Sequence, residues 1–499
     1  MQKKIQKLKD ILAEIADLNG AIALLEWDQQ TYMPKGGAEA RAWQLGTLGK
    51  LQHEKSTSPE LGKLLDGLRN MTEAMDPDSD DARMIKFAVR DYDRETCVTP
   101  EFVVERAQVT SRAHHAWAEA RSKADFSVFE PHLEKIVDLT RRYIDFFPPA
   151  DHPYDILLDI YEPEMKTLDV KRIFDELKPG QVELIRTIGK KEQVDNSFLF
   201  QPFDEKKQWA FGMDVIKQIG YETDRGRQDK THHPFTTEFS INDVRITTRV
   251  DPGFFNTMIF STVHEAGHAL YAQGHSLKLE RTNLANGASL AVHESQSRMW
   301  ENLVARSLPF WEYYYPKLRE YFPQLGSVDP DTFYRGINRV EPSLIRVEAD
   351  EATYNLHIML RLELEIGIIE GKIKVRDLPG IWNAKMREYL GVEPGDDAQG
   401  VLQDVHWSMG AFGYFPTYAL GNLISAQLWE KINQDIPDLA VQISAGKFDE
   451  LLGWLRTNIH RHGRKFMPKE LVEKVLASEI DPAPYIRYLR DKFGRIYGF

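Results

Sequence analysis

Two histidines, His264 and His268, enclose Glu265 in the part of the sequence with the clearest potential for chemistry. The segment reads H-E-x-x-H and lies in a run of helical character from about residue 254 to 272. Residues four apart share one face of a helix, so both imidazoles can reach one metal ion. Glu265 points about 100° further round, where its carboxylate can take a proton from a water molecule beside the ion. The spacing therefore predicts two metal ligands and a general base. The alternative is an amphipathic helix with ordinary core or surface histidines.

Glu294 is the predicted third ligand, because a catalytic zinc ion usually has three protein ligands and one open position. It lies in a second helical run, over about residues 289–307, and turn chemistry near Gly287 lets this helix return antiparallel. Two alternatives remain open: Glu294 as a solvated carboxylate, and His293 as the ligand, although His293 points about 100° away from Glu294. Glu301, one heptad later, could support a ligand histidine or be a plain surface residue. A site of two histidines and one glutamate favours metal-assisted hydrolysis.

One divalent metal ion per chain is the cofactor that these ligands predict, with Zn²⁺ as the first choice. Co²⁺ or Mn²⁺ could occupy the same ligands, because selectivity depends on geometry and metal supply. A structural zinc site is usually closed by four ligands and rich in cysteine, whereas this chain has one cysteine, Cys97. Together with the intact Glu265, this argues against a catalytically silent peptide-binding protein with a structural zinc.

The elements that position these residues are mostly helices. Apolar residues recur at helical spacing from Ile5 to Ile15 and over much of the chain. Ser58, Thr99 and Asp329 each precede a proline, which predicts that helices begin there. Further helices are predicted over about residues 38–53, 83–93, 102–123, 131–145, 170–190, 206–220, 348–371, 407–434, 448–462 and 469–478.

Residues 235–250 are the exception to the helical pattern. Residues 236–241 are rich in strand formers, Asn242-Asp243 breaks the run, and residues 244–250 alternate apolar and polar. This predicts a short β-hairpin just before the H-E-x-x-H helix. An edge strand there could hold an extended substrate by main-chain hydrogen bonds, or the hairpin could be a small structural sheet. We expect a mainly α fold in which two helical halves flank a deep groove, with the metal at its base.

Length and composition limit the possible classes of protein. The net charge of −13 and pI near 5.7 argue against nucleic-acid and anionic-membrane partners. The sequence has no apolar run that predicts a transmembrane span or a signal peptide. A single thiol is typical of a cytoplasmic protein, so we expect the protein in the cytoplasm. No linker supports a division of the 499 residues. We therefore expect one unit over residues 1–499, with a helical part over about 1–200 and the metal site and groove in 201–499.

Six short segments, taken together and in order, resemble the motifs of one family, carboxypeptidase Taq, the thermostable metallocarboxypeptidases with an H-E-x-x-H site. His293-Glu294-Ser295-Gln296 departs from the family pattern H-E-S-x-Q because no residue separates Ser295 from Gln296. Residues 25–34 also resemble this family, but their sequence predicts no chemical role. The six segments are His233-Pro234-Phe235 (H-P-F), residues 243–247 (D-x-R-x-T), 264–268 (H-E-x-x-H), 293–296, 345–350 (I-R-x-x-A-D) and 400–407 (G-x-x-Q-D-x-H-W).

The resemblance implies a zinc carboxypeptidase that releases single amino acids from the free C-termini of peptides, with broad side-chain tolerance. It also implies a mainly helical fold with a long groove, shared with neurolysin-like oligopeptidases, and a homodimer. A neurolysin-type endo-acting oligopeptidase with the same metal chemistry is the alternative. An aminopeptidase is less favoured, because no G-x-M-x-N-like strand precedes the metal helix.

A carboxypeptidase must bind a free α-carboxylate one residue beyond the scissile bond, and the planar fork of an arginine suits this task. Arg346 in the I-R-x-x-A-D segment is the first candidate. Its alternative role is a helix ion pair with Glu348 or Asp350. Arg245 is the second candidate, although on a strand it could simply pair with Asp243 or brace the cleft.

The developing oxyanion also needs hydrogen-bond donors, and His233, His406, Tyr414 and Tyr418 are the candidates. Tyr414 and Tyr418 lie four apart on one face of a predicted helix, where tyrosines are often core residues. His406 lies three positions after Gln403 in G-x-x-Q-D-x-H-W, and its alternative role is that of a hydrogen-bonded structural histidine. We predict that Gln403 also belongs to the substrate-binding set.

Overall fold

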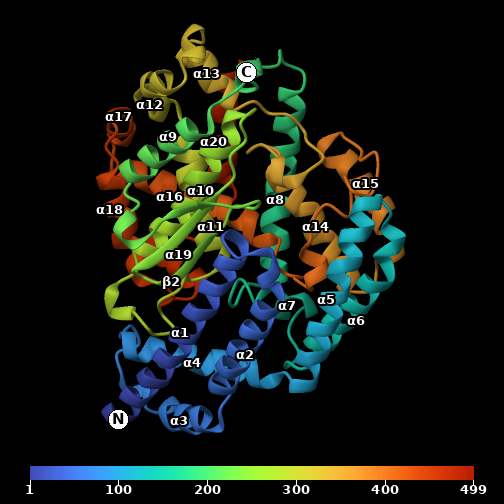
Figure 1. Ribbon diagram of the computed structural model, residues 1–499, viewed down its shortest axis with the longest axis vertical. Helices are drawn as coiled ribbons and strands as arrows, with labels where there is room; N and C mark the ends of the chain where they lie inside the picture. The colour runs from blue at the N-terminus through green and yellow to red at the C-terminus, as the bar shows by residue number, and fades with distance from the viewer.

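The computed structural model describes residues 1–499 and is mainly helical, as the periodicity predicts (Figure 1). None of its helices combines the length and the apolar character needed to cross a membrane. The helices before the sheet are α1 (Gln2–Thr31), α2 (Ala38–Ser56), α3 (Pro59–Arg69), α4 (Asp80–Cys97), α5 (Pro100–Lys123), α6 (Glu130–Ile144), α7 (Pro153–Leu158), α8 (Thr167–Ile188) and α9 (Glu205–Gln218). The helices after it are α10 (Phe255–Gln273), α11 (Leu290–Arg298), α12 (Leu308–Tyr321), α13 (Pro330–Ile337), α14 (Tyr354–Ile369), α15 (Leu378–Leu390), α16 (Pro416–Asp435), α17 (Leu439–Ser444), α18 (Asp449–Asn458), α19 (Pro468–Leu476) and α20 (Ala483–Tyr497).

Helix starts follow the local chemistry of the sequence. The side chains of Ser58, Thr99 and Asp329 accept hydrogen bonds from backbone N–H groups in the first turns of α3, α5 and α13, so all three predicted starts are confirmed. The periodicity does not predict α12, α15 or α20, each of which has a proline in its first turn.

The sheet has three strands, β1 (Gln228–Lys230), β2 (Thr236–Ser240) and β3 (Asp243–Thr248), in the order β1-β3-β2. β2 and β3 form the predicted antiparallel hairpin, and β1 adds to β3 in parallel. β1 is too short and polar to carry a strand pattern in the sequence. β2 is an edge strand, and the sheet packs against α10, which carries the H-E-x-x-H residues.

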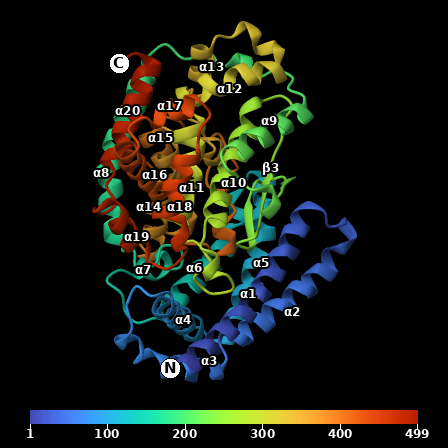
Figure 2. The ribbon, with the colours of Figure 1, turned by 90° about the vertical axis from the view of Figure 1, so that its left-hand side faces the viewer.

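The core is divided unequally along the chain. The main hydrophobic cluster draws on residues from Ala113 to Tyr497. A smaller one joins α1, α3 and α4 to Leu279, Leu284 and Met467. α2 buries only Ser56, and the α1–α2 hairpin projects from the body (Figure 2).

A cavity of about 930 Å³ lies between α1, α4 and α5 on one side and β2 on the other. Its lining reaches from Leu12 in α1 to His293 in α11. This cavity is lined by β2 and by His293 but by no residue of α10, so the groove with the metal at its base stays a prediction.

Three predicted helix boundaries are wrong, each for a local reason. α16 begins at Pro416 rather than near residue 407, because Gly410 and Gly413 adopt φ values of +69° and +90° that no right-handed helix contains. Tyr414 therefore precedes the helix, so Tyr414 and Tyr418 do not share a helix face.

The other two differences lie beside the candidate site. The run over 289–307 is α-helical only to Arg298 and continues as a π-helix over Met299–Ala305, a form often found at functional sites. α14 begins at Tyr354 rather than near residue 348. Asp350 accepts hydrogen bonds from the N–H groups of Ala352 and Thr353, which delays the helix start.

Candidate active site

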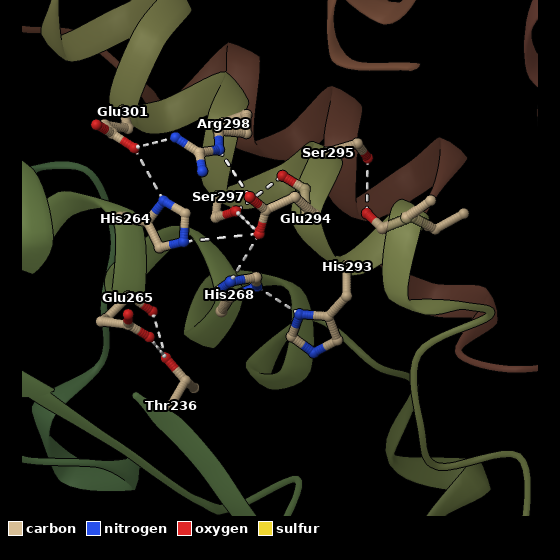
Figure 3. A network of polar contacts seen from close by, with 12 residues as sticks. Thr236, His264, Glu265, His268, His293, Glu294, Ser295, Ser297, Arg298 and Glu301 are labelled. Atoms are coloured by element: carbon tan, nitrogen blue, oxygen red, sulfur yellow. Dashed lines mark hydrogen bonds and ion pairs between the residues drawn. The ribbon is translucent and has the colours of Figure 1, made fainter. Parts of the chain in front are cut away.

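The three predicted ligands His264, His268 and Glu294, here called the metal cluster, come together where α10 packs against α11 (Figure 3). The Nε2 atoms of His264 and His268 lie 3.6 and 3.5 Å from Oε2 of Glu294. All three ligand atoms lie within 4.8 Å of one another. Gly267 permits the close approach of the helices, since a Cβ there would lie 2.6 Å from the Cα of Ser297. Two imidazole nitrogens and one carboxylate oxygen suit a catalytic divalent metal ion.

Glu294 is held in its ionised form by its neighbours on α11. Arg298 Nε donates to Glu294 Oε1 at 2.7 Å, and the hydroxyl of Ser297 lies 3.2 Å from Oε2. Burial raises the pKa of Glu294, but the charges of Arg298 and His264 outweigh burial and bring the pKa well below its usual range. A metal ligand must be deprotonated, so this environment prepares Glu294 for that role.

His264 is oriented by Glu301, which lies in the π-helical segment. Oε2 of Glu301 lies 2.9 Å from Nδ1 of His264, so the Nε2 atom faces Glu294. Arg298 and Arg306 each lie 3.2 Å from Glu301. Burial raises the pKa of Glu301, but Arg298 and His264 bring it down to about 2. Of the two roles considered for Glu301, the geometry favours support of a ligand histidine.

His268 is oriented by His293 rather than by a carboxylate. The two Nδ1 atoms lie 2.6 Å apart, and Nε2 of His293 lies 3.1 Å from Oε1 of Glu238 in β2. All these contacts are satisfied when His268 donates from Nδ1 and His293 donates from Nε2. Burial lowers the pKa of His268 to about 3, which keeps the ring neutral. His293 thus lies behind a ligand histidine, and Glu294 offers its oxygen to the cluster.

Glu265 lies beside the metal cluster and is held by the edge strand β2 (Figure 3). The Thr236 hydroxyl lies 2.7 Å from Oε2 of Glu265 and 2.9 Å from its main-chain oxygen. Burial raises the pKa of this carboxyl, and the charge of His264 opposes the rise. A buried carboxylate of raised pKa beside a metal site suits a group that accepts and returns a proton.

Arg346 lies in a second polar group, formed by Arg346, Arg361, Gln403 and Asp404 and here called the arginine cluster. Its Nε and Nη2 atoms donate to Oδ1 of Asp404 at 3.0 and 2.9 Å. Ion pairs of Arg346 with Glu348 or Asp350 are not formed, so that alternative was wrong. Arg346 precedes α14 in a short 3₁₀ turn, and its guanidinium pairs with Asp404 rather than with either acidic neighbour.

The arginine cluster contains two buried guanidiniums and one carboxylate. Arg361, which is fully buried, donates from Nε to Oδ2 of Asp404 at 2.7 Å and from Nη2 to Gln403 at 2.8 Å. Gln403 Oε1 also accepts the main-chain N–H of Arg346 at 2.9 Å. Burial raises the pKa of Asp404, but the two arginines hold it well below its usual range. Two cations sharing one direct anionic partner leave an environment that favours a further anion.

Tyr354 links the two clusters. The guanidinium carbon of Arg298, which holds Glu294, lies 4.6 Å from the centroid of the Tyr354 ring. The Tyr354 hydroxyl accepts from Nη1 of Arg346 at 2.9 Å. Tyr418 lies against the same guanidinium, with 5.0 Å from the carbon to its ring centroid. The structure therefore brings Arg346 and Tyr418 to the side of the metal cluster.

His406 and Tyr414 complete this region. Their ring centroids lie 5.1 Å apart, and those of Tyr414 and Tyr418 lie 5.4 Å apart. Burial lowers the pKa of His406 to about 4, so the ring is neutral near pH 7. Its Nδ1 atom is buried and has no hydrogen-bond partner. The neutral imidazole of His406 and the hydroxyl of Tyr414 can each donate a hydrogen bond to a polar ligand.

Arg245 in β3 contacts Asp243 and α1 rather than either cluster. Its Nε and Nη2 atoms both donate to Asp243 at 2.9 Å, which confirms the alternative of an Asp243 pair. The guanidinium carbon lies 4.5 Å from the ring centroid of Trp27 in α1. The Tyr32 hydroxyl, at the end of α1, donates to Asp229 in β1. These contacts give the familial stretch over residues 25–34 a structural role: it fixes α1 to the sheet.

His233 lies in the exposed segment between β1 and β2. Burial of part of the ring and the neighbouring His232 lower its pKa. No hydrogen bond joins His233 to the metal cluster or to the arginine cluster, so its role stays a prediction.

Several residues of the site are absent from the sequence-based set. Arg298 could have been found, because it lies four residues after Glu294 and forms an i,i+4 pair with it. Asp404 stands inside a segment already singled out. Thr236 and Tyr354 act through tertiary contacts that no spacing along the chain reveals.

Residues 7–493 match the family model described as the carboxypeptidase Taq (M32) metallopeptidase. The chain belongs to this family. It is 42% identical to thermostable carboxypeptidase 1 of Thermus thermophilus, over 99% of both chains, and 39% identical to carboxypeptidase 1 of Bacillus subtilis, over 98% of this chain and 97% of that one. A crystal structure of an M32 carboxypeptidase from Deinococcus radiodurans R1 is 41% identical and superimposes with a TM-score of 0.97 over 100% of both chains. The protein is thus a peptide hydrolase of the metallocarboxypeptidase class, and the oligopeptidase alternative is not favoured.

Proposed function

We propose that the metal cluster binds Zn²⁺ and that Glu265 is the general base for hydrolysis of the last peptide bond. The convergence of three ligand atoms carries this proposal. The Nδ1 atoms of the two histidines contact Glu301 and His293, so each Nε2 atom is left to bind the ion. Co²⁺ and Mn²⁺ remain possible occupants of the same ligands.

The metal ion supplies two effects when bound: it polarises the scissile carbonyl and makes a water molecule more acidic. Glu265 takes the proton from that water and delivers it to the leaving amine. The Thr236 hydroxyl holds the Glu265 carboxylate in one orientation. Because Thr236 begins the edge strand β2, a peptide lying along that strand would meet the base in a defined register.

Arg346 binds the free carboxylate of the peptide in this proposal. Two observations support it: two guanidiniums of the arginine cluster share Asp404, and Tyr354 connects Arg346 to the metal side. Asp404 and Tyr354 fix the guanidinium, which still has N–H groups to offer. Gln403 holds the main chain of Arg346 and completes the position of the arginine.

His406, Tyr414 and Tyr418 donate hydrogen bonds to the substrate or to the developing oxyanion. Burial raises the pKa of both tyrosines, so both hydroxyls keep their protons at neutral pH. Donors that are already in place act without reorganisation when negative charge develops. His233 and Arg245 stay as secondary candidates for contacts further along the substrate.

The proposal also includes a homodimer and a cytoplasmic location. Membership of the family supports the homodimer, and the single free thiol, Cys97, supports the location. The proposed contacts are to the main chain and the terminal carboxylate of the peptide, so we also propose that the enzyme accepts many different C-terminal side chains. Sedimentation analysis of the purified protein tests the dimer.

The experiment that tests the function compares one peptide as a free acid and as a C-terminal amide, with products followed by mass spectrometry. The metal-loaded protein should remove single residues from the acid and leave the amide intact. Internal cleavage of both forms would refute the exopeptidase assignment, and cleavage of neither would refute the enzyme assignment.

A further inference from the structure

Glu365 in α14 is a fully buried carboxylate outside both clusters. Its Oε1 atom accepts from the indole Nε1 of Trp407 at 2.8 Å. Its Oε2 atom accepts from the main-chain N–H of Gly413 at 2.9 Å and from the Tyr154 hydroxyl at 2.6 Å. Hydrogen bonds to a buried carboxylate are strong, and each of these three donors would be costly to leave unpaired.

Two of the three donors belong to one loop, residues 406–414, here called the His406 loop. Trp407 follows His406 directly, and Gly413 precedes Tyr414 directly. Glu365 therefore accepts a hydrogen bond near each end of this loop. The first and last residues of the loop, His406 and Tyr414, are two of the proposed substrate donors. The third donor, Tyr154, comes from α7 and fixes the carboxylate itself.

The His406 loop is joined at its end to Glu365 and to the start of α16. Hydrogen bonds within the loop join Gly410 and Ala411 to its first two residues, whereas the N–H of Gly413 bonds to Glu365. Gly413 adopts φ +90°, and a Cβ there would lie 2.6 Å from the carbonyl of Leu157 in α7. The loop thus lies directly on α7. At its end, Glu365 accepts the N–H of Gly413, and the carbonyl of Tyr414 accepts the N–H of Thr417 in α16.

We propose that Glu365 is a positioning residue for substrate binding, which acts by placing His406 and Tyr414 together. The inference rests on the proposed function, because it takes these two side chains as substrate donors. A carboxylate is the group that suits this place, since both of its oxygens accept. A glutamine keeps the shape but offers one oxygen, so its NH₂ group would face a donor on one end of the loop.

The first test is hydrogen exchange with mass spectrometry on metal-loaded Glu365→Gln. We expect faster exchange in residues 406–415 and unchanged exchange in α10 and α11. Glu363→Gln is the matched control: it lies on the same helix, and its carboxylate bonds to Lys178, Lys385 and Tyr389 instead. Full protection of the loop in Glu365→Gln would overturn the proposal.

Kinetics separate positioning from a general loss of structure. A misplacement of about 1 Å can cost about 100-fold in rate, so we expect kcat/KM of Glu365→Gln to fall about 10- to 100-fold with unchanged metal content. In a His406→Ala, Tyr414→Phe background the same change should cost less than about 3-fold, because the side chains that it places are gone. A full additional loss in that background would overturn the proposal.

The two proposals fail in different ways. Unchanged kinetics in His406→Ala and in Tyr414→Phe would refute the donor roles given to those residues under the proposed function. A loop that loosens in Glu365→Gln, together with a loss that vanishes in the double variant, supports the positioning role.

Discussion

The metal cluster and the arginine cluster lie on either side of Tyr354, yet they are built from different kinds of segment. The ligands of the metal cluster come from two packed helices, α10 and α11. The arginine cluster takes Arg346 from a 3₁₀ turn, Arg361 from α14, and Asp404 from the loop before α16. Helices fix the metal ligands through regular spacing, whereas the arginines depend on one shared carboxylate.

The two clusters also have opposite charge. The metal cluster contains Glu294 and lies beside Glu265 and Glu301, which suits a cation. The arginine cluster has two guanidiniums on Asp404, which suits an anion. The C-terminal end of a peptide needs both, because its scissile carbonyl must meet the metal and its carboxylate must meet a cation. Changes on the metal side should therefore alter chemistry or metal content, and changes on the arginine side should alter recognition or stability.

The largest expected effect is on the metal side, from Glu265→Gln. Removal of a general base costs about 100- to 10,000-fold, so kcat should fall by roughly 1,000-fold while the metal stays bound. Activity assays together with elemental analysis give both quantities. His264→Ala is the contrasting variant and should lose metal and activity together. Retained turnover in Glu265→Gln would contradict the role of Glu265.

On the arginine side, Asp404→Asn should mainly lower stability. It leaves Arg346 and Arg361 buried without their shared carboxylate, and breaking a buried pair costs about 3–5 kcal/mol. Urea unfolding of the variant and of wild-type protein measures the free energy of unfolding. An unchanged free energy would show that another group compensates both arginines.

A smaller effect is expected from Glu301→Gln, which removes the charged partner of His264. Loss of such a partner typically costs about 10- to 100-fold in metal affinity. Competition with a metal chelator measures the affinity, and Glu320→Gln, an exposed glutamate on α12, is the control. Equal affinities in Glu301→Gln and wild-type protein would exclude the orienting role.

The smallest effect concerns a buried carboxyl that has no arginine beside it. Glu162 accepts the N–H of Ala291 at the start of α11, and burial raises its pKa to about 8. A raised folded-state pKa means that stability is lost as pH rises from about 4.5 towards 8, with a slope of at most about 1.4 kcal/mol per pH unit. Unfolding from pH 6 to 8.5 should therefore show a flatter profile in Glu162→Gln than in wild-type protein. Parallel profiles would contradict the raised pKa.

The two clusters also differ in how far the sequence predicts them. The metal cluster follows from helical spacing in two adjacent segments, and the β2–β3 hairpin follows from its alternation of residues. The partner of Arg346 did not follow: spacing favoured Glu348 and Asp350, but the side chain reaches Asp404, far away in the chain. Tyr414 was placed on a helix because periodicity does not register the left-handed glycines Gly410 and Gly413.

Helix contacts and loop conformations thus divide the predictable part from the rest. Glu294 could be found because α10 and α11 are consecutive, and Arg298 could have been found in the same way. Thr236, Tyr354 and Glu365 join segments that meet only in the folded chain. Spacing along the chain does not reveal their roles.

The preference for a free C-terminus in Arg346→Ala and Arg346→Lys tests whether Arg346 binds the terminal carboxylate. The quantity to measure is kcat/KM for the free-acid peptide divided by that for its amide, in both variants and in wild-type protein. Losing one partner of a buried charged contact costs about 2–5 kcal/mol, so we expect a drop of about 30-fold or more in this ratio for Arg346→Ala. Arg346→Lys, which keeps the charge without the fork, should lie between the two. A ratio that stays at the wild-type value in a folded, metal-loaded Arg346→Ala protein would contradict the claim that Arg346 binds the terminal carboxylate.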